Sequence, residues 1–142
     1  MSVVESEEST SVKEYCQKYD SSSVTLANFP SELNLVIRIV AETGSSNYEW
    51  NYLKILVSGK IISVAKEYYE QDASVRTYNG DTLEQNLYRL QAALLSFQGP
   101  PFTLQRLCEV VSEPKRFCGK SLNKFLRCMV KMVSVTTVVL PG

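Results

Sequence analysis

The chain has 142 residues, of which 44% are hydrophobic and 21% are charged, enough for one globular domain with a substantial core. Its formal net charge is zero, and it contains no histidine. The absence of histidine removes the usual general base, the histidine-dependent nucleophile systems and the commonest metal ligand, so we expect no enzyme activity.

No uninterrupted apolar run approaches the ~20 residues that cross a bilayer, so no membrane association is expected. The N-terminus is acidic and lacks the basic start and apolar segment of a secretory signal. We therefore expect a protein of the nucleus and cytoplasm, where thiols stay reduced.

The N-terminal part predicts a tail and then helices. Residues 1–12 are rich in serine and glutamate without periodicity, which predicts a flexible acidic tail, and 13–142 predict one helical domain. A short helix is expected from Val12 to Asp20. The next helix is expected to begin near Asn28–Ser31 and to end at Gly44, as a left-handed cap.

A long helix is predicted next. Ser45 or Ser46 is expected to open it, and its apolar residues recur at steps of three and four as far as about Glu70. Gly59 lies inside this pattern at a cost of ~1 kcal/mol relative to alanine. A kink or a close helix contact is therefore expected there.

A turn at Tyr78–Gly80 separates this helix from the following one. Asp81 and Glu84 have the spacing of a capping box, and a stripe of leucines ending at Phe97 follows them. Gly99–Pro101 then breaks the chain.

The segment after this break predicts another helix, ending at about Ser112. Thr103 is a suitable cap for it, and Phe102 and Leu107 occupy the positions of a hydrophobic staple.

The last part predicts a basic loop at 115–120 and a helix from Leu122 to about Met132, capped by Ser121. The β-branched residues from Val133 to Leu140 predict a strand. The fold class is therefore mainly α, a single domain of five to six helices with a short C-terminal β element.

Four cysteines, Cys16, Cys108, Cys118 and Cys128, match no paired spacing of a zinc or redox site. Cys108 and Cys128 lie among apolar residues and are interpreted as small hydrophobic residues. We expect no disulfide framework, no metal and no cofactor.

Charge is unevenly distributed. Residues 1–105 contain eight Lys/Arg and thirteen Asp/Glu, whereas 106–142 contain seven and two. Glu109 and Glu113 stand about one helical turn apart and are interpreted as solvated acids rather than a catalytic pair.

The cations of the second part suggest a surface. Lys120, Lys124, Arg127 and Lys131 are spaced four, three and four, so they line one face of the last helix. This face is either solvated or a docking surface for an acidic protein partner. The sparse aromatic residues and the isoelectric point of 6.3 argue against nucleic acid.

Two polar residues, Gln105 and Arg106, have no obvious structural duty, and each is either a surface contact or a bond to neighbouring backbone. The candidate partner-binding residues are Gln105, Arg106, Lys115, Arg116, Lys120, Lys124, Arg127 and Lys131.

Several of these residues belong to a longer pattern. It consists of the run PFTLQRLCE at 101–109, Pro114, the run KFLR at 124–127 and the apolar stretch Val133–Pro141, preceded by ETG at 42–44 and Trp50. The pattern resembles the core of the protein phosphatase 4 regulatory subunit 2 family. The likeness covers roughly residues 33–141.

The resemblance implies a non-catalytic regulatory or scaffold subunit. Such a subunit joins the phosphatase 4 catalytic subunit and a third regulatory subunit in a complex that acts on phosphoserine and phosphothreonine proteins. The alternative is a divergent interaction module of the same fold, recruited to a different nuclear or RNA-processing complex. The family pattern has an acidic residue and an asparagine around the lysine that matches Lys131, where this chain has Val130 and Met132.

Overall fold

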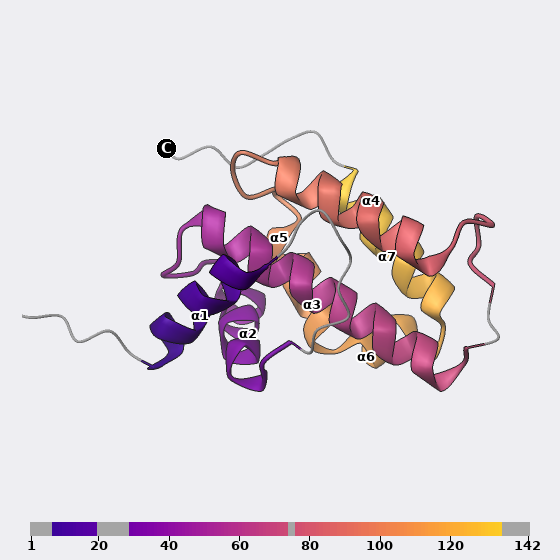
Figure 1. Ribbon diagram of the computed structural model, residues 1–142, viewed down its shortest axis with the longest axis horizontal. Helices are drawn as coiled ribbons and strands as arrows, with labels where there is room; N and C mark the ends of the chain where they lie inside the picture. Colours follow the sequence, from indigo (N-terminus) through magenta and orange to yellow (C-terminus); the bar gives the residue numbers. More distant parts are fainter. Residues whose placement is uncertain (1–6, 20–28, 74–75, 135–142) are drawn as a thin grey trace, which may run out of the picture.

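The longest helix of the computed structural model runs through the middle of the molecule, with the other helices around it (Figure 1). The structure describes residues 7–19, 29–73 and 76–134. Within these ranges the helices are α1 (Glu7–Lys18), the 3-10 helix η1 (Ser31–Leu33), α2 (Asn34–Thr43), α3 (Trp50–Gln71), α4 (Leu83–Ser96), α5 (Leu104–Ser112), α6 (Pro114–Cys118) and α7 (Leu122–Val133). The mainly helical fold class is confirmed, with seven α-helices in the described residues where five or six were expected.

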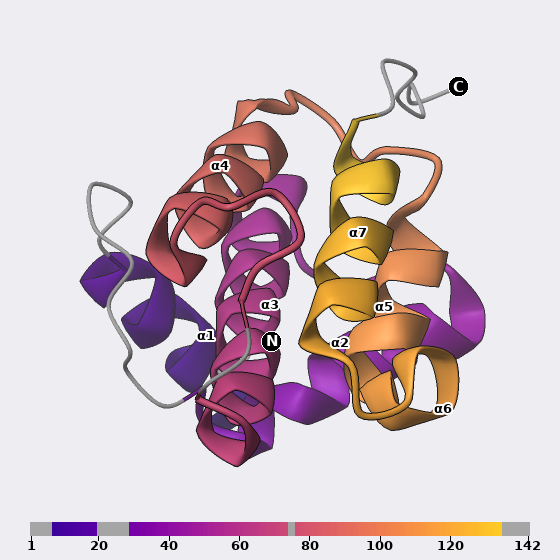
Figure 2. The same cartoon turned by 90° about the vertical axis from the view of Figure 1, so that its right-hand side faces the viewer.

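Helix α3 is central because apolar residues surround it instead of forming one stripe. Four consecutive residues, Leu56–Gly59, are all buried, and ten of its residues are buried altogether. A helix that is apolar on every side must be covered on every side. Figure 2 shows α1 and α7 on opposite sides of α3, and α4 also packs along it.

A second packing unit joins helices that lie far apart in the sequence. Helices α2 and α5 pack extensively against each other, and α7 closes the core against α3 and α4. The fully buried ring of Phe125 on α7 lies 5.6 Å from the ring of Tyr68 on α3. The Tyr68 hydroxyl donates to the Gly119 carbonyl at 2.8 Å, which fixes the turn before α7.

The N-terminal boundaries differ from the prediction. Helix α1 begins at Glu7, so part of the segment predicted as a flexible tail is helical, and Val12 is fully buried against the domain. Tertiary packing overrides the low apolar content of this segment. The predicted cap Asn28 lies outside the described residues, whereas Gly44 ends α2 with φ +79° and donates to the Val40 carbonyl, as predicted.

Two helix starts were wrongly placed. Helix α3 begins at Trp50 instead of Ser45 or Ser46, and Glu49 precedes it without a side-chain cap. The capping box of α4 lies one residue later than predicted: Thr82 accepts from the Gln85 backbone, and the Gln85 side chain accepts from the Thr82 backbone.

The C-terminal part holds two further corrections. The predicted basic loop at 115–120 contains the short helix α6, because Pro114 starts a helical turn that Gly119 ends at φ +59°. No strand is found among the described residues. Val133, predicted to begin one, is the last residue of α7, and the rest of that stretch (135–142) lies outside the described ranges.

Candidate partner-binding surface

Gln105, in the first turn of α5, ties this helix to the end of α2. Its Nε2 donates to the Ala41 carbonyl at 3.2 Å, and its Oε1 lies 3.2 Å from the position a Cβ would take on Gly44. Glycine is therefore favoured at 44 for two reasons: its backbone is left-handed, and the Gln105 side chain leaves little room for a Cβ. Of the two roles expected for Gln105, the structure shows the bond to neighbouring backbone, and a partner contact stays a prediction.

Arg106, Arg116 and Phe117 form what we call the arginine–phenylalanine cluster. The guanidinium carbons of Arg106 and Arg116 lie 4.6 and 5.4 Å from the centre of the Phe117 ring. Arg106 also pairs with Glu109 at 2.8 Å, and Arg116 pairs with Glu113 at 3.0 Å. Both positive charges are thus compensated locally, and the two acids are ion-pair partners.

Lys120, Lys124, Arg127 and Lys131 form what we call the basic row, which follows α7 and the turn before it. All four are exposed, and none makes an ion pair within the part of the chain that the structure describes. The Ser121 hydroxyl accepts from the Lys124 backbone at 3.1 Å, so the predicted cap of this helix is confirmed.

The Arg127 guanidinium lies 4.9 Å from the centre of the Tyr78 ring. Asn123 holds the same segment onto α7, because its Nδ2 donates to the Arg76 carbonyl at 2.8 Å and its Oδ1 accepts from the Tyr78 backbone at 2.9 Å. Arg127 therefore has a packing contact as well as a charge, which sets it apart from the lysines of the basic row.

The eight candidate residues do not form one surface. Lys115 lines a small space against the end of α3, whereas Arg116 borders a hollow of about 490 Å³ between α2, α5 and α6. The structure therefore separates the expected surface into the compensated arginine–phenylalanine cluster and the uncompensated basic row.

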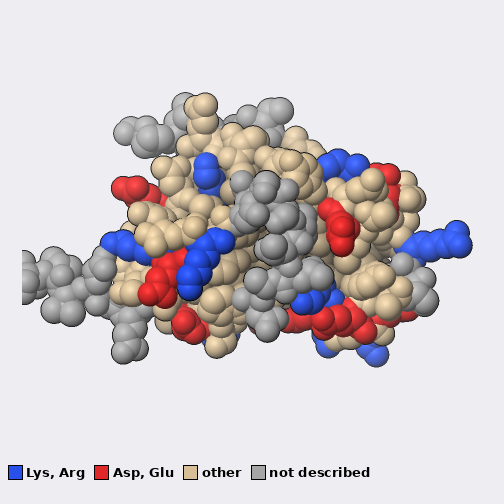
Figure 3. Space-filling model, in the orientation of Figure 1, with Lys and Arg blue, Asp and Glu red and all other residues tan. Residues whose placement is uncertain are grey.

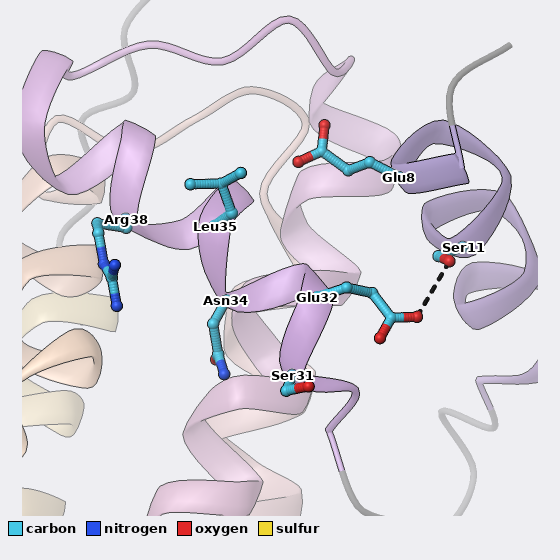
Figure 4. A pocket seen from close by; sticks show the side chains of 7 residues that line it. All are labelled: Glu8, Ser11, Ser31, Glu32, Asn34, Leu35 and Arg38. Carbon is cyan, nitrogen blue, oxygen red and sulfur yellow. Dashed lines mark hydrogen bonds between the residues drawn. The ribbon is translucent and has the colours of Figure 1, made fainter.

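The outer face of α2 carries a feature that the sequence reading did not predict. Leu35 and Ile39, four residues apart, are 51% and 41% exposed. Leu35 and Arg38 border an open hollow of about 690 Å³ between α2, η1 and α1, which Glu8 and Glu32 also line (Figure 4). The sequence could have predicted this face, because Leu35 and Ile39 are apolar but lie outside the helical stripe of Val36, Ile37 and Val40.

Charges on the face that carries α1 are mixed. In Figure 3, acidic and basic side chains alternate over this side of the molecule without a large patch of one sign.

The thiols are packing groups. Cys108 is fully buried, and burial raises the pKa of its thiol to about 12, while partial burial raises the pKa of Cys16 to about 11. Both thiols stay protonated near neutral pH and are weak nucleophiles. No group of three potential ligands that could hold a metal occurs among residues 7–19, 29–73 and 76–134. No described helix is long and apolar enough to cross a bilayer.

The described residues form a helical domain with open surface hollows, compensated arginines and an uncompensated basic row, an arrangement that suits contacts with other proteins. The family model PPP4R2 matches residues 20–142. The chain belongs to this family, that of protein phosphatase 4 regulatory subunit 2.

Individual relatives agree with this assignment. Serine/threonine-protein phosphatase 4 regulatory subunit 2 of Drosophila melanogaster is 31% identical over 122 residues, covering 80% of this chain and 19% of that protein. The proteins of the same name from Xenopus tropicalis and Homo sapiens are each 31% identical, covering 79% and 72% of this chain and 29% and 26% of theirs. This chain thus spans less than a third of the length of these relatives. No solved structure matches it.

The relatives are named as regulatory subunits, a non-catalytic role, which confirms the expectation that the chain is not an enzyme. Met132 and Val130 are the two residues at which this chain differs from the pattern expected of the family. Met132 is buried, and its carbonyl accepts from the Thr103 hydroxyl at 3.0 Å, so this position is part of the core. Val130 is partly exposed.

Proposed function

We propose that this chain is a regulatory and scaffold subunit of a protein phosphatase 4-type complex, which binds the catalytic subunit and helps to target it. The observation that carries the proposal is the family match over residues 20–142, which includes every helix from η1 to α7. By the same resemblance, the complex includes a third regulatory subunit and acts in the nucleus and cytoplasm.

The basic row is the surface that we assign to an acidic partner. Its lysines are exposed and make no ion pair within the described residues, so a partner's carboxylates would not compete with an existing pair. Exposed charges of this kind steer association and add salt dependence more than they add affinity. The arginine–phenylalanine cluster is a weaker candidate, because Glu109 and Glu113 already occupy its arginines.

Affinity purification of the tagged chain from its own cells tests the proposal. We expect a phosphatase 4 catalytic subunit in near-stoichiometric amount, and activity toward a phosphothreonine peptide in the eluate. A bait with Phe125→Asp, which places a charge in the core, is the control for non-specific capture. A folded bait that recovers no phosphatase catalytic subunit would contradict the proposal.

The second candidate is a divergent module of the same fold in a different nuclear or RNA-processing complex. It is favoured by Val130, a partly exposed apolar residue next to Lys131, at one of the two places where the chain departs from the family pattern. The same purification separates the two functions, because the alternative predicts stoichiometric partners that include no phosphatase.

A further inference from the structure

The outer face of α2 is formed by Leu35, Arg38, Ile39 and Glu42, which follow one another at helical steps of three and four. All four residues are exposed, whereas the buried residues of α2 lie on the opposite side of the helix. The helix therefore presents an apolar pair to solvent in addition to the stripe that joins the core.

This face can be reached from outside. On one side of α2 lies the hollow of about 690 Å³ toward α1 and η1 (Figure 4), and on the other side lies the hollow of about 490 Å³ toward α5 and α6. Arg38 borders both hollows. A second molecule can therefore approach α2 without displacing any described element.

The two charges of this face are opposite in sign and four residues apart. Neither Arg38 nor Glu42 makes an ion pair within residues 7–19, 29–73 and 76–134. A cation that precedes an anion is the less favourable order for such a pair within one helix. Both charges are thus left for a partner that offers an anion and a cation at the same spacing.

A second copy of the chain has these properties. Its α2 brings the same two apolar side chains and the same two charges, and antiparallel pairing about a two-fold axis places Arg38 of each copy near Glu42 of the other. Parallel pairing would instead bring like charges together. The formal net charge of the chain is zero, so no overall repulsion opposes the approach of two copies.

We propose that the chain forms a homodimer through the outer face of α2. The two α2 helices lie antiparallel, with Leu35 and Ile39 of both copies in contact and Arg38 of each copy paired with Glu42 of the other. Two exposed apolar residues per copy make a small interface, so the dimer is weak, with a Kd on the order of 0.1 mM. The basic row belongs to α7 and takes no part, so each copy keeps it for an acidic partner.

Sedimentation equilibrium of the full chain from about 1 µM to about 1 mM tests this. The mean mass should rise from the 16.0 kDa of one copy toward twice that value. Leu35→Ser with Ile39→Ser should stay monomeric over this range and keep its urea midpoint, because both residues are exposed. The matched control is Tyr88→Ser with Phe102→Ser, which removes two rings that are 50% and 58% exposed elsewhere, and it should dimerise like the unaltered chain.

Charge reversal distinguishes this contact from non-specific association. Arg38→Glu alone and Glu42→Arg alone should each weaken self-association at least about tenfold, because each variant places like charges opposite one another. An equimolar mixture of these two variants should form a heterodimer at least as readily as the unaltered chain dimerises, because every acid then faces an arginine of the other copy. Circular dichroism should show both variants folded.

Three results would overturn the proposal. The first is a chain that stays monomeric up to about 1 mM. The second is a dimer that survives Leu35→Ser with Ile39→Ser, because the copies would then meet elsewhere. The third is a mixture of the two charge variants that associates no better than either variant alone, because the antiparallel pairing of Arg38 with Glu42 would then be wrong.

Discussion

The hydroxyl of Thr103 shows how a correct residue was given an incorrect role. The position matches a helix cap, but the side chain makes no capping bond with α5 and instead donates to the Met132 carbonyl near the end of α7, 3.0 Å away. The N-cap preference of threonine reflects bonds within its own helix. It could not predict this bond, whose partner lies 29 positions away in the sequence. Phe102, predicted as a buried staple with Leu107, is 58% exposed, so that prediction was wrong.

Substitution of Thr103 by valine should lower the free energy of unfolding by about 1 kcal/mol, because it removes one bond between α5 and α7 while keeping the shape. Phe102→Ala is the matched control and should change it by less than about 0.5 kcal/mol, since the ring is exposed. Urea unfolding measures both free energies. A larger loss for Phe102→Ala than for Thr103→Val would support the hydrophobic staple of Phe102 and Leu107.

The Cys108 thiol should react with iodoacetamide only as fast as the domain opens. Burial raises its pKa to about 12, so at pH 8 the folded chain holds almost no thiolate at this site. Because the folded state binds this proton more tightly than the unfolded state, stability should fall as pH rises above the ordinary thiol value. Mass spectrometry of labelled peptides checks the first expectation, and labelling of Cys108 in step with partly exposed Cys128 would contradict it.

Between elements, the contact of α2 with α5 depends on Gly44 and Gln105. Gly44 and Gly80 both have φ near +79°, but only a Cβ on Gly44 would meet a neighbour, the Gln105 side chain. The two glycines therefore separate the cost of the backbone conformation from the cost of the contact.

Gly44→Ala should destabilise the chain more than Gly80→Ala, which should cost about 1–2 kcal/mol for the left-handed backbone alone. The excess should shrink in a Gln105→Ala background, as a double-mutant cycle measures. Equal costs at both glycines would mean that the Gln105 side chain moves aside freely.

Helices were predictable where apolar residues repeat over several turns, as in α3, α4 and α7. Their ends were less so, because Thr82 and Gln85 cap α4 from positions adjacent to the pair that the sequence suggested. The five-residue α6 escaped prediction because it is too short for a period to show. A helix was expected from Val12, but α1 already begins at Glu7, inside the segment predicted as a tail.

At the scale of the whole molecule, the sequence pattern predicted the family and the helical class, and both are confirmed. The candidate surface was less predictable. Spacing places Lys120, Lys124, Arg127 and Lys131 on one side of a helix, but it does not show which cations acquire partners. The fold brings Arg106 on α5 to the ring of Phe117 on α6. It also brings Tyr78 to the guanidinium of Arg127.

The basic row offers a final prediction, which rests on the proposed phosphatase partnership. Lys124→Glu with Lys131→Glu should weaken binding to a recombinant phosphatase 4 catalytic subunit about tenfold at ~0.1 M salt, because exposed cations that attract the partner become repulsive. Arg127 is left in place, since its contact with Tyr78 would confuse a binding effect with a packing effect. Urea unfolding should show the fold unchanged.

The matched control reverses two exposed cations elsewhere, Lys13 and Lys18 on α1, and should bind like the unaltered chain. Affinity of the unaltered chain should fall as salt rises, and the Lys124/Lys131 variant should show a flatter slope, because fewer favourable charge contacts remain to be screened. If that variant keeps both the affinity and the slope, the basic row is a solvated face. The contact must then be sought at the arginine–phenylalanine cluster or on the outer face of α2, where Leu35 and Ile39 would bind through apolar burial with little dependence on salt.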